Sequence, residues 1–323
     1  MNTKTKDQAY VRFLNDVRTG LTSEPKYLSS KYIYDRQGDA IFQEIMAMPE
    51  YYLTDAEYEV FTKNTEAILS RFYESGTEFN LVELGAGDGK KTKVLLEALL
   101  YKSIDFCYQP IDISGNALRL LETDLKDLYP NLNVMPKEGE YFEVLHSLRT
   151  NSKKPKVIMM LGSNLGNLEH KNAIDFLQKI ALAMGEKDIF FIGLDQKKDP
   201  QTILNAYNDP HGITERFNKN ILTRINGELG GHFDIDKFIH WESYDPETGT
   251  AKSYLLSTTN QSVYIDDLQL NINFDAWESI HVEISQKYDD AIVNWLAEEA
   301  GLKVDQSFSD SRDYFKNYIL LKA

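Results

Sequence analysis

The stretch VELGAGDGKKT, residues 82–92, decides the fold of this chain. The apolar run 81–84 predicts a buried strand, and the pattern of 91–100 predicts a helix that follows it directly. Three glycines stand between the two, where they let the backbone turn tightly and approach a ligand closely. An ordinary strand-to-helix turn is the alternative interpretation, and the glycines alone do not exclude it.

Strands and helices keep alternating over the residues that follow this stretch. Short, continuous apolar strands between helices imply a parallel sheet that helices cover on both faces, with right-handed crossovers. The sequence therefore predicts an α/β fold. The predicted strands are 81–84, 106–111, 132–135, 157–161 and 189–194, and the predicted helices are 91–100, 116–128 and 171–184.

The alternation stops after Asp195, where the pattern of 241–285 instead predicts antiparallel strands. Near the C-terminus a further helix precedes a pair of strands that returns to the sheet. We therefore predict two domains. The first is doubly wound and made of 61–196 and 286–323, and the second is made of 8–60 and 197–285.

A helix is also predicted to begin near Thr54, before the first strand. Thr54 and Glu57 have the spacing of a capping box, in which the threonine caps the first turn and the glutamate reaches back to the cap amide. This pattern assigns Glu57 a local role at the start of the helix.

Composition excludes several classes of protein. The 323 residues carry 35 basic and 50 acidic side chains, a net charge of −15, which argues against the clustered basic face that nucleic acid needs. With 42% hydrophobic residues the chain can bury a sizeable core, which rules out wholesale disorder. The single cysteine, Cys107, excludes an intramolecular disulfide and a cysteine-based zinc site, and the six histidines offer no close metal-binding pair.

The apolar runs of the sequence are strand-sized. The longest, 157–161 and 189–194, are far shorter than the ~20 residues that a membrane-spanning helix needs. The first residues also lack the apolar core of a secretory signal. We therefore expect a cytoplasmic monomer that binds neither a membrane, nor nucleic acid, nor a metal ion.

The residues around the glycines indicate a ligand that contains adenosine. Asp112 ends the strand after the glycine loop, where a carboxylate can accept both ribose hydroxyls. NAD and S-adenosylmethionine both fit this layout. The dinucleotide fingerprint requires its third glycine at position 90, which is Lys90 here, whereas this chain has Gly89. We therefore favour S-adenosylmethionine, and Glu83 ahead of the loop suits the ammonium of its methionine part.

Two further loops follow predicted strands and can add to this site. Glu140 and Tyr141 place a carboxylate beside a ring, which suits the amino group and the face of an adenine. The loop 162–167 contains two glycines and two asparagines, and Asn167 can donate to a carboxylate or accept from an amine. Either loop, taken alone, has the composition of a solvated turn.

Together these motifs resemble those of one family. The chain is similar, over nearly its whole length, to the L-histidine Nα-methyltransferases of ergothioneine biosynthesis. The Tyr-Asp and Pro-Glu-Tyr-Tyr elements are more specific than the glycine loop. The matching motifs, in chain order, are YIYD (32–35), MPEYY (48–52), ELGAG (83–87), LGSNLGN (161–167), FNKN (217–220) and EISQK (283–287).

The resemblance implies a fold and an activity. The fold would be a Rossmann-like class I methyltransferase with a mostly parallel sheet, together with a separate substrate-binding domain formed by the N-terminus and the insertion. The activity would be the trimethylation of the α-amino group of L-histidine to hercynine, with S-adenosylmethionine as methyl donor.

The resemblance also implies roles for individual residues. Tyr34 would be the catalytic residue, Asn167 and Tyr207 would hold the carboxylate and amino end of the substrate, and Glu283 and Ser285 would read its imidazole. The implied substrate-binding residues are Tyr34, Tyr51, Gly162, Asn167, Tyr207, Glu283 and Ser285. The implied cofactor-binding residues are Gly85, Gly87, Lys91, Asp112, Glu140 and Tyr141.

Some positions depart from the family pattern. Glu140 stands where an aspartate is frequent, Ser253 stands where a methionine packs on the imidazole, and Gln286 replaces a small residue. Two other functions therefore stay open beside histidine methylation. One is methylation of another amino acid or small amine, and the other is a regulatory protein that binds the cofactor without turnover.

The chemistry of methyl transfer explains the three tyrosines. An amine attacks a sulfonium methyl only in its neutral form. Most of the rate enhancement then comes from holding the amine close to that methyl and aligned with it. Tyr34 can orient the amine, and successive methylations leave a quaternary ammonium that aromatic faces stabilise. Each tyrosine alone is more often a core residue, so the argument depends on Tyr34, Tyr51 and Tyr207 acting together.

Overall fold

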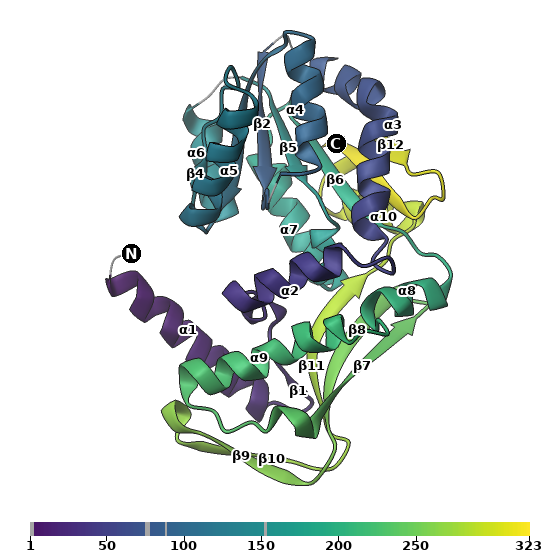
Figure 1. Cartoon of the computed structure of the whole chain (residues 1–323). Coiled ribbons are helices and arrows are strands. Elements are labelled where there is room, and N and C mark those ends of the chain that lie inside the picture. The colour runs from purple at the N-terminus through teal and green to yellow at the C-terminus, as the bar shows by residue number, and fades with distance from the viewer. Residues whose placement is uncertain (1–2, 75–77, 88, 152–153) are drawn as a thin grey trace. The chain divides into compact units, whose positions relative to one another are not determined.

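The computed structural model describes residues 3–74, 78–87, 89–151 and 154–323 (Figure 1). The chain splits into two compact units. We call Leu53–Lys197 with Gln286–Ala323 the large-sheet unit, and Met1–Tyr52 with Lys198–Ser285 the small-sheet unit. Within the described residues, no helix is both long enough and apolar enough to cross a membrane.

The large-sheet unit is built on seven described strands in the order β12-β13-β6-β5-β2-β3-β4. Of these, only β13 runs antiparallel to its neighbours, so the sheet is mostly parallel, as predicted. The strands are β2 (Glu78–Leu84), β3 (Asp105–Asp112), β4 (Lys137–Glu138), β5 (Lys156–Met160), β6 (Ile189–Asp195), β12 (Leu302–Ser309) and β13 (Phe315–Lys322).

One predicted strand of this sheet is wrong. Residues 132–135 make a single bridge, between Val134 and Tyr108, and the edge strand β4 begins only at Lys137. Pro136 lies between them and has no N–H to donate to a ladder, which explains why pairing does not continue through this segment.

Helices cover both faces of the large sheet. Val82 and Leu84 of β2 pack with α6, α7 and α10, whereas Phe79 and Leu81 of the same strand pack with α3, α4 and α5. This alternation follows from the period of two residues along a strand. The helices are α3 (Leu53–Glu74), α4 (Thr92–Tyr101), α5 (Gly115–Leu128), α6 (Tyr141–Asn151), α7 (His170–Ala183) and α10 (Asp290–Glu299).

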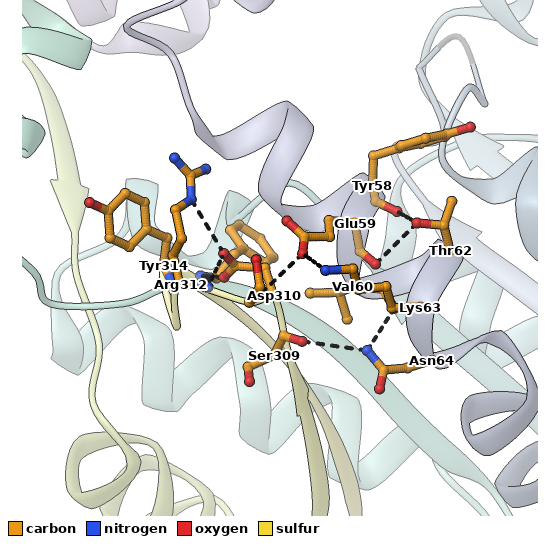
Figure 2. A network of polar contacts seen from close by, with 12 residues as sticks. Tyr58, Glu59, Val60, Thr62, Lys63, Asn64, Ser309, Asp310, Arg312 and Tyr314 are labelled. Carbon is orange, nitrogen blue, oxygen red and sulfur yellow. Dashed lines mark hydrogen bonds and ion pairs between the residues drawn. The ribbon is translucent and has the colours of Figure 1, made fainter.

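The predicted boundary between residues 60 and 61 falls inside α3. Figure 2 shows what fixes this helix to the large-sheet unit: the Asn64 amide donates to the Ser309 carbonyl at 3.4 Å, beside the turn between β12 and β13. Asp310 closes that turn by accepting from the backbone N–H groups of Tyr314 at 2.7 Å and Phe315 at 2.8 Å. The whole of α3 therefore belongs with the large sheet, because its apolar face packs there.

The small-sheet unit contains four described strands in the order β1-β11-β8-β7 and a separate hairpin. The sheet strands are β1 (Lys26–Tyr27), β7 (Phe238–Asp245), β8 (Thr250–Ser257) and β11 (Ser279–Gln286), and the hairpin is β9 (Gln261–Ile265) and β10 (Leu270–Phe274). β7 pairs with β8 and β9 pairs with β10 in antiparallel register, as the alternation in 241–285 predicted. The substrate-binding role of this unit stays a prediction.

Helices pack on the small sheet through one apolar cluster. Phe13 and Val17 of α1, Ile41 of α2 and Phe217 of α9 are buried there against Val282 of β11. The helices are α1 (Thr3–Thr22), α2 (Arg36–Met46), α8 (Pro200–Tyr207) and α9 (Ile213–Leu229), and the short 3-10 turns of the chain are Ser30–Tyr32, Asn164–Asn167, Ile235–Lys237 and Asp266–Leu268.

Candidate active site

The glycine loop joins β2 to α4 in the large-sheet unit. Gly85, Gly87 and Gly89 have φ angles of +70°, +55° and +65°, a region that residues with a side chain rarely adopt. β2 lies between β3 and β5, so chain order reverses in the sheet at this strand. Ligands of such folds bind beyond the carboxyl ends of the strands at this reversal point. Asp88 of the loop lies outside the described residues.

Four of the predicted cofactor-binding residues lie together at this loop. A Cβ added to Gly85 would lie 2.8 Å from the hydroxyl oxygen of Tyr141, so that ring covers the start of the loop. Burial, and then the charges of Asp112 and Glu140, raise the pKa of the Tyr141 hydroxyl to about 12. Asp112 is itself oriented, because its Oδ1 accepts from the Ser114 N–H at 2.8 Å.

Lys91, at the end of the loop, contacts two other segments of the same unit. Its ammonium forms an ion pair with Glu57 of α3. A Cβ added to Gly162, in the loop after β5, would lie 3.4 Å from the Lys91 Nζ. The predicted capping box is therefore wrong for Glu57, whose carboxylate turns into the unit toward this lysine.

Glu83, which precedes the loop, is buried with 2% of its surface exposed. Its carboxylate accepts from the Thr92 hydroxyl at 2.9 Å and from the Tyr108 hydroxyl at 2.6 Å. Burial raises the pKa of this carboxyl to about 7, although both hydrogen bonds act in the opposite direction. The group therefore titrates near neutral pH.

The Glu83→Gln variant is expected to change how stability depends on pH. The ordinary pKa is 4.5 and the folded value is about 7, so the folded state binds this proton more tightly. The contribution of Glu83 to wild-type stability should be largest below pH 4.5 and fall by about 3 kcal/mol as pH rises through 7. Glu83→Gln removes that fall.

Urea denaturation of both proteins at pH 5 and pH 8 measures this effect. Glu143→Gln, at an exposed position of α6, is the control and should follow the wild type. A Glu83→Gln protein that loses as much stability as the wild type between these pH values would contradict the prediction.

The loop after β5 is held from several directions. Gly162 and Ser163 have φ angles of +73° and +59°. The Ser163 Oγ accepts from the Asp195 N–H at 3.0 Å, and a Cβ on Gly166 would lie 3.0 Å from the Gln286 carbonyl oxygen. Asn167, the last residue of the 3-10 turn, is exposed. A fixed loop thus presents this amide to solvent at one end.

In the small-sheet unit, the three predicted tyrosines lie together. Tyr51 stands 6.3 Å from Tyr207, ring centre to ring centre, and 6.3 Å from Phe42. Tyr34 stands 5.6 Å from Phe42 and 5.2 Å from Phe217. We call these five residues the tyrosine cluster. Phe42 and Phe217 were not among the predicted pocket residues, because each has the spacing of a core residue in its helix.

Both predicted residues of β11 reach the tyrosine cluster. The hydroxyls of Ser285 and Tyr207 lie 2.9 Å apart and share a hydrogen bond. Burial, followed by the charge of Glu283, raises the pKa of the Tyr34 hydroxyl well above its usual range. Tyr34 keeps 36% of its surface exposed. A carboxylate, hydroxyls and aromatic faces are therefore grouped within one unit.

Ser253 of β8 has a partner that sequence reasoning missed. Its hydroxyl donates to the Glu242 carboxylate of β7 at 2.6 Å, and both residues are buried. The His240 Nε2 lies 3.8 Å from the same carboxylate, and burial lowers the pKa of this imidazole to about 4, so it is neutral at pH 7. The cross-strand pairing of 242 with 253 is a register effect that no local pattern reveals.

The sheet order, the reversed strand β13 and the left-handed glycine loop are features of a Rossmann-like class I methyltransferase fold. The family described as histidine-specific, S-adenosylmethionine-dependent methyltransferases matches residues 13–322, and this chain belongs to that family. The resemblance, the α/β fold with a mostly parallel sheet and the choice of S-adenosylmethionine over NAD are thereby confirmed.

Curated relatives agree with this membership. A histidine N-alpha-methyltransferase of Mycobacterium tuberculosis is 31% identical over 297 residues, which cover 92% of this chain and 91% of the relative. One of Mycolicibacterium smegmatis is 32% identical over 305 residues, covering 94% and 93%. An ergothioneine biosynthesis protein 1 of Schizosaccharomyces pombe is 27% identical over 301 residues, covering 91% of this chain and 39% of that longer protein.

Proposed function

We propose that this protein trimethylates the α-amino group of L-histidine to hercynine. The observation that carries the proposal is the grouping of Glu283 and Ser285 with the tyrosine cluster in the small-sheet unit. An imidazole has a nitrogen at each edge, and a carboxylate and a hydroxyl can bond both. The names of the two mycobacterial relatives support the same substrate.

The large-sheet unit contributes the residues that hold the methyl donor. The backbone of Gly85 and Gly87 allows close approach, Asp112 accepts from the ribose hydroxyls, and Glu140 with Tyr141 holds the adenine. Lys91 is complementary to a carboxylate, and the donor has one carboxylate, at its methionine end. As the resemblance implies, we assign Gly162 and Asn167 of this unit to binding the amino-acid substrate.

The donor supplies an electrophilic methyl group on a sulfonium. In each transfer the amine nitrogen forms a bond to that methyl carbon while the carbon–sulfur bond breaks and S-adenosylhomocysteine leaves. After the first and second transfers the ammonium so formed releases a proton to solvent, which restores the lone pair for the next transfer. The raised pKa of Tyr34 keeps its hydroxyl protonated at neutral pH. Tyr34 therefore orients the amine as a hydrogen-bond donor or through its ring, and does not remove the proton.

The trimethylated product suits the tyrosine cluster. After the third transfer the nitrogen carries a permanent positive charge with no N–H to donate. Aromatic faces attract such a cation by about 0.5–2 kcal/mol each. Tyr34, Tyr51 and Tyr207 supply these faces, while the hydrogen bond between Tyr207 and Ser285 fixes one ring.

A second candidate is methylation of another amino acid. It is favoured by Ser253 and Gln286, two departures from the family pattern, and by the buried Ser253–Glu242 hydrogen bond. The carboxylate of Glu242, behind Ser253, would favour a substrate side chain with several hydrogen-bond donors over an apolar ring.

We further propose that the enzyme acts as a cytoplasmic monomer. The single, buried Cys107 suits a reducing compartment.

Labelled S-adenosylmethionine, offered with a panel of amino acids and with histamine, tests the proposal. We expect histidine to be the best substrate and mass spectrometry to find three added methyl groups. Histamine keeps the imidazole and the amine but lacks the carboxylate, so its kcat/KM should be at least about tenfold lower, because the groups that would bind the carboxylate are left without it. Equal turnover of histamine and histidine would contradict the roles of Asn167 and Tyr207.

A further inference from the structure

We propose that Glu57 is a positioning residue for methyl-donor binding, acting through Lys91 and the backbone of Gly162. The inference rests on the proposed role of Lys91 at the donor. Glu57 is fully buried, with none of its surface exposed. One carboxylate oxygen contacts both the Lys91 ammonium and the Gly162 N–H, the latter at 2.9 Å, so it joins the glycine loop to the loop after β5.

The other carboxylate oxygen fixes Glu57 to the sheet. Its Oε1 accepts from the side-chain amide of Asn317, in β13, at 2.9 Å. Gly193 of β6 provides the room, since a Cβ there would lie 2.1 Å from the same oxygen. The carboxylate therefore has one attachment to the rigid sheet and two to loops that carry predicted site residues.

Burial of this carboxylate is costly unless its partners hold it, so the geometry of the group is tightly constrained. Lys91 is less constrained than Glu57, because 22% of its side chain is exposed. A lysine loses much rotamer freedom when it is held in place. Its ammonium has three N–H donors, of which the ion pair with Glu57 engages one. Glu57 thus holds the ammonium in place before the donor's carboxylate arrives, which reduces the cost of ordering it on binding.

Calorimetry of S-adenosylhomocysteine binding tests this role in the full-length protein. Glu57→Met keeps the volume but removes every acceptor, and should weaken binding about tenfold, the effect of one charge-assisted hydrogen bond. Glu57→Gln keeps one acceptor for Lys91 and Gly162, and should lose about threefold. Binding of 5′-methylthioadenosine, which lacks the carboxylate, should change little in either variant.

A double-mutant cycle shows whether Glu57 acts through Lys91. Lys91→Met should weaken S-adenosylhomocysteine binding, and adding Glu57→Met should then have little further effect. Asp188→Asn is the matched control, because it disturbs another buried lysine pair of this unit, with Lys156 at the opposite end of β5. It should lower the Tm and leave the affinity unchanged.

The outcomes separate the two proposals. If Lys91→Met weakens binding but Glu57→Met does not, or if the two effects add, the positioning role is wrong and the role of Lys91 stands. If Lys91→Met leaves the affinity for S-adenosylhomocysteine unchanged, the role of Lys91 at the donor and the positioning role of Glu57 are both wrong. Equal losses for S-adenosylhomocysteine and 5′-methylthioadenosine would also overturn the inference. Should Glu57→Met fail to fold, the same cycle is run with Glu57→Gln.

Discussion

The Lys287→Met variant is expected to lose about 3–5 kcal/mol of its free energy of unfolding, the cost of leaving one member of a buried ion pair alone. The Lys287 Nζ lies 2.8 Å from the Asp195 carboxylate, and neither side chain has exposed surface. Asp195 ends β6, and its backbone N–H donates to Ser163 in the loop after β5. Removing the lysine therefore leaves a buried carboxylate at the end of a central strand.

Urea denaturation with the wild type alongside measures the loss. Lys126→Met, which removes a surface ion pair with Glu122 on α5, is the control and should cost less than about 1 kcal/mol. The double variant Asp195→Leu, Lys287→Met should recover much of the loss, because no charge then stays buried. A Lys287→Met loss as small as that of Lys126→Met would contradict the argument.

The Glu283→Ala variant is expected to lower kcat/KM for histidine by roughly 10²-fold, through loss of a hydrogen bond between a charged group and the substrate. The carboxylate is close enough to the tyrosine cluster to raise the pKa of Tyr34. The variant should also favour tryptophan relative to histidine, because an indole, with its single N–H, satisfies this half-buried carboxylate less well than an imidazole does and gains when it is removed.

The measurement is kcat/KM for histidine and for tryptophan in both proteins, with Tm as a check on folding. Glu278→Ala is the matched control. It removes a carboxylate immediately before β11 whose partner is Lys26, away from the tyrosine cluster, and should leave the substrate ratio unchanged. An unchanged ratio in a well-folded Glu283→Ala protein would show that Glu283 does not read the side chain of the substrate.

Sequence patterns predicted those parts of the fold in which local and global preferences agree. The strand before the glycine loop carries apolar residues on both of its faces because helices cover both, and this pattern is visible in the sequence. The segment 132–135 has the same apolar appearance but makes only one bridge, since pairing at a sheet edge depends on the neighbouring strand. The edge strand β4 is therefore where the sequence prediction failed.

The candidate site was predictable where a residue type has one chemical use. Gly85, Gly87 and Gly89 have the left-handed backbone that favours glycine, and Asp112 ends the next strand. The residues of the tyrosine cluster come from helices α2, α8 and α9 and from the loops on either side of α2, and only the resemblance to a family grouped its tyrosines in advance. Glu242 was missed, because its hydrogen bond to Ser253 depends on the register of β7 against β8.

The sequence by itself determined the parallel sheet, the glycine loop and the class of ligand, because each depends on residue types that are close along the chain. Only the tertiary structure determined which partners the buried charged side chains bond. Glu57 has the spacing of a helix cap, yet it bonds Lys91, Gly162 and Asn317. A buried carboxylate takes the strongest donors within reach, and those donors lie 34 to 260 residues away along the chain. No local pattern records such distances.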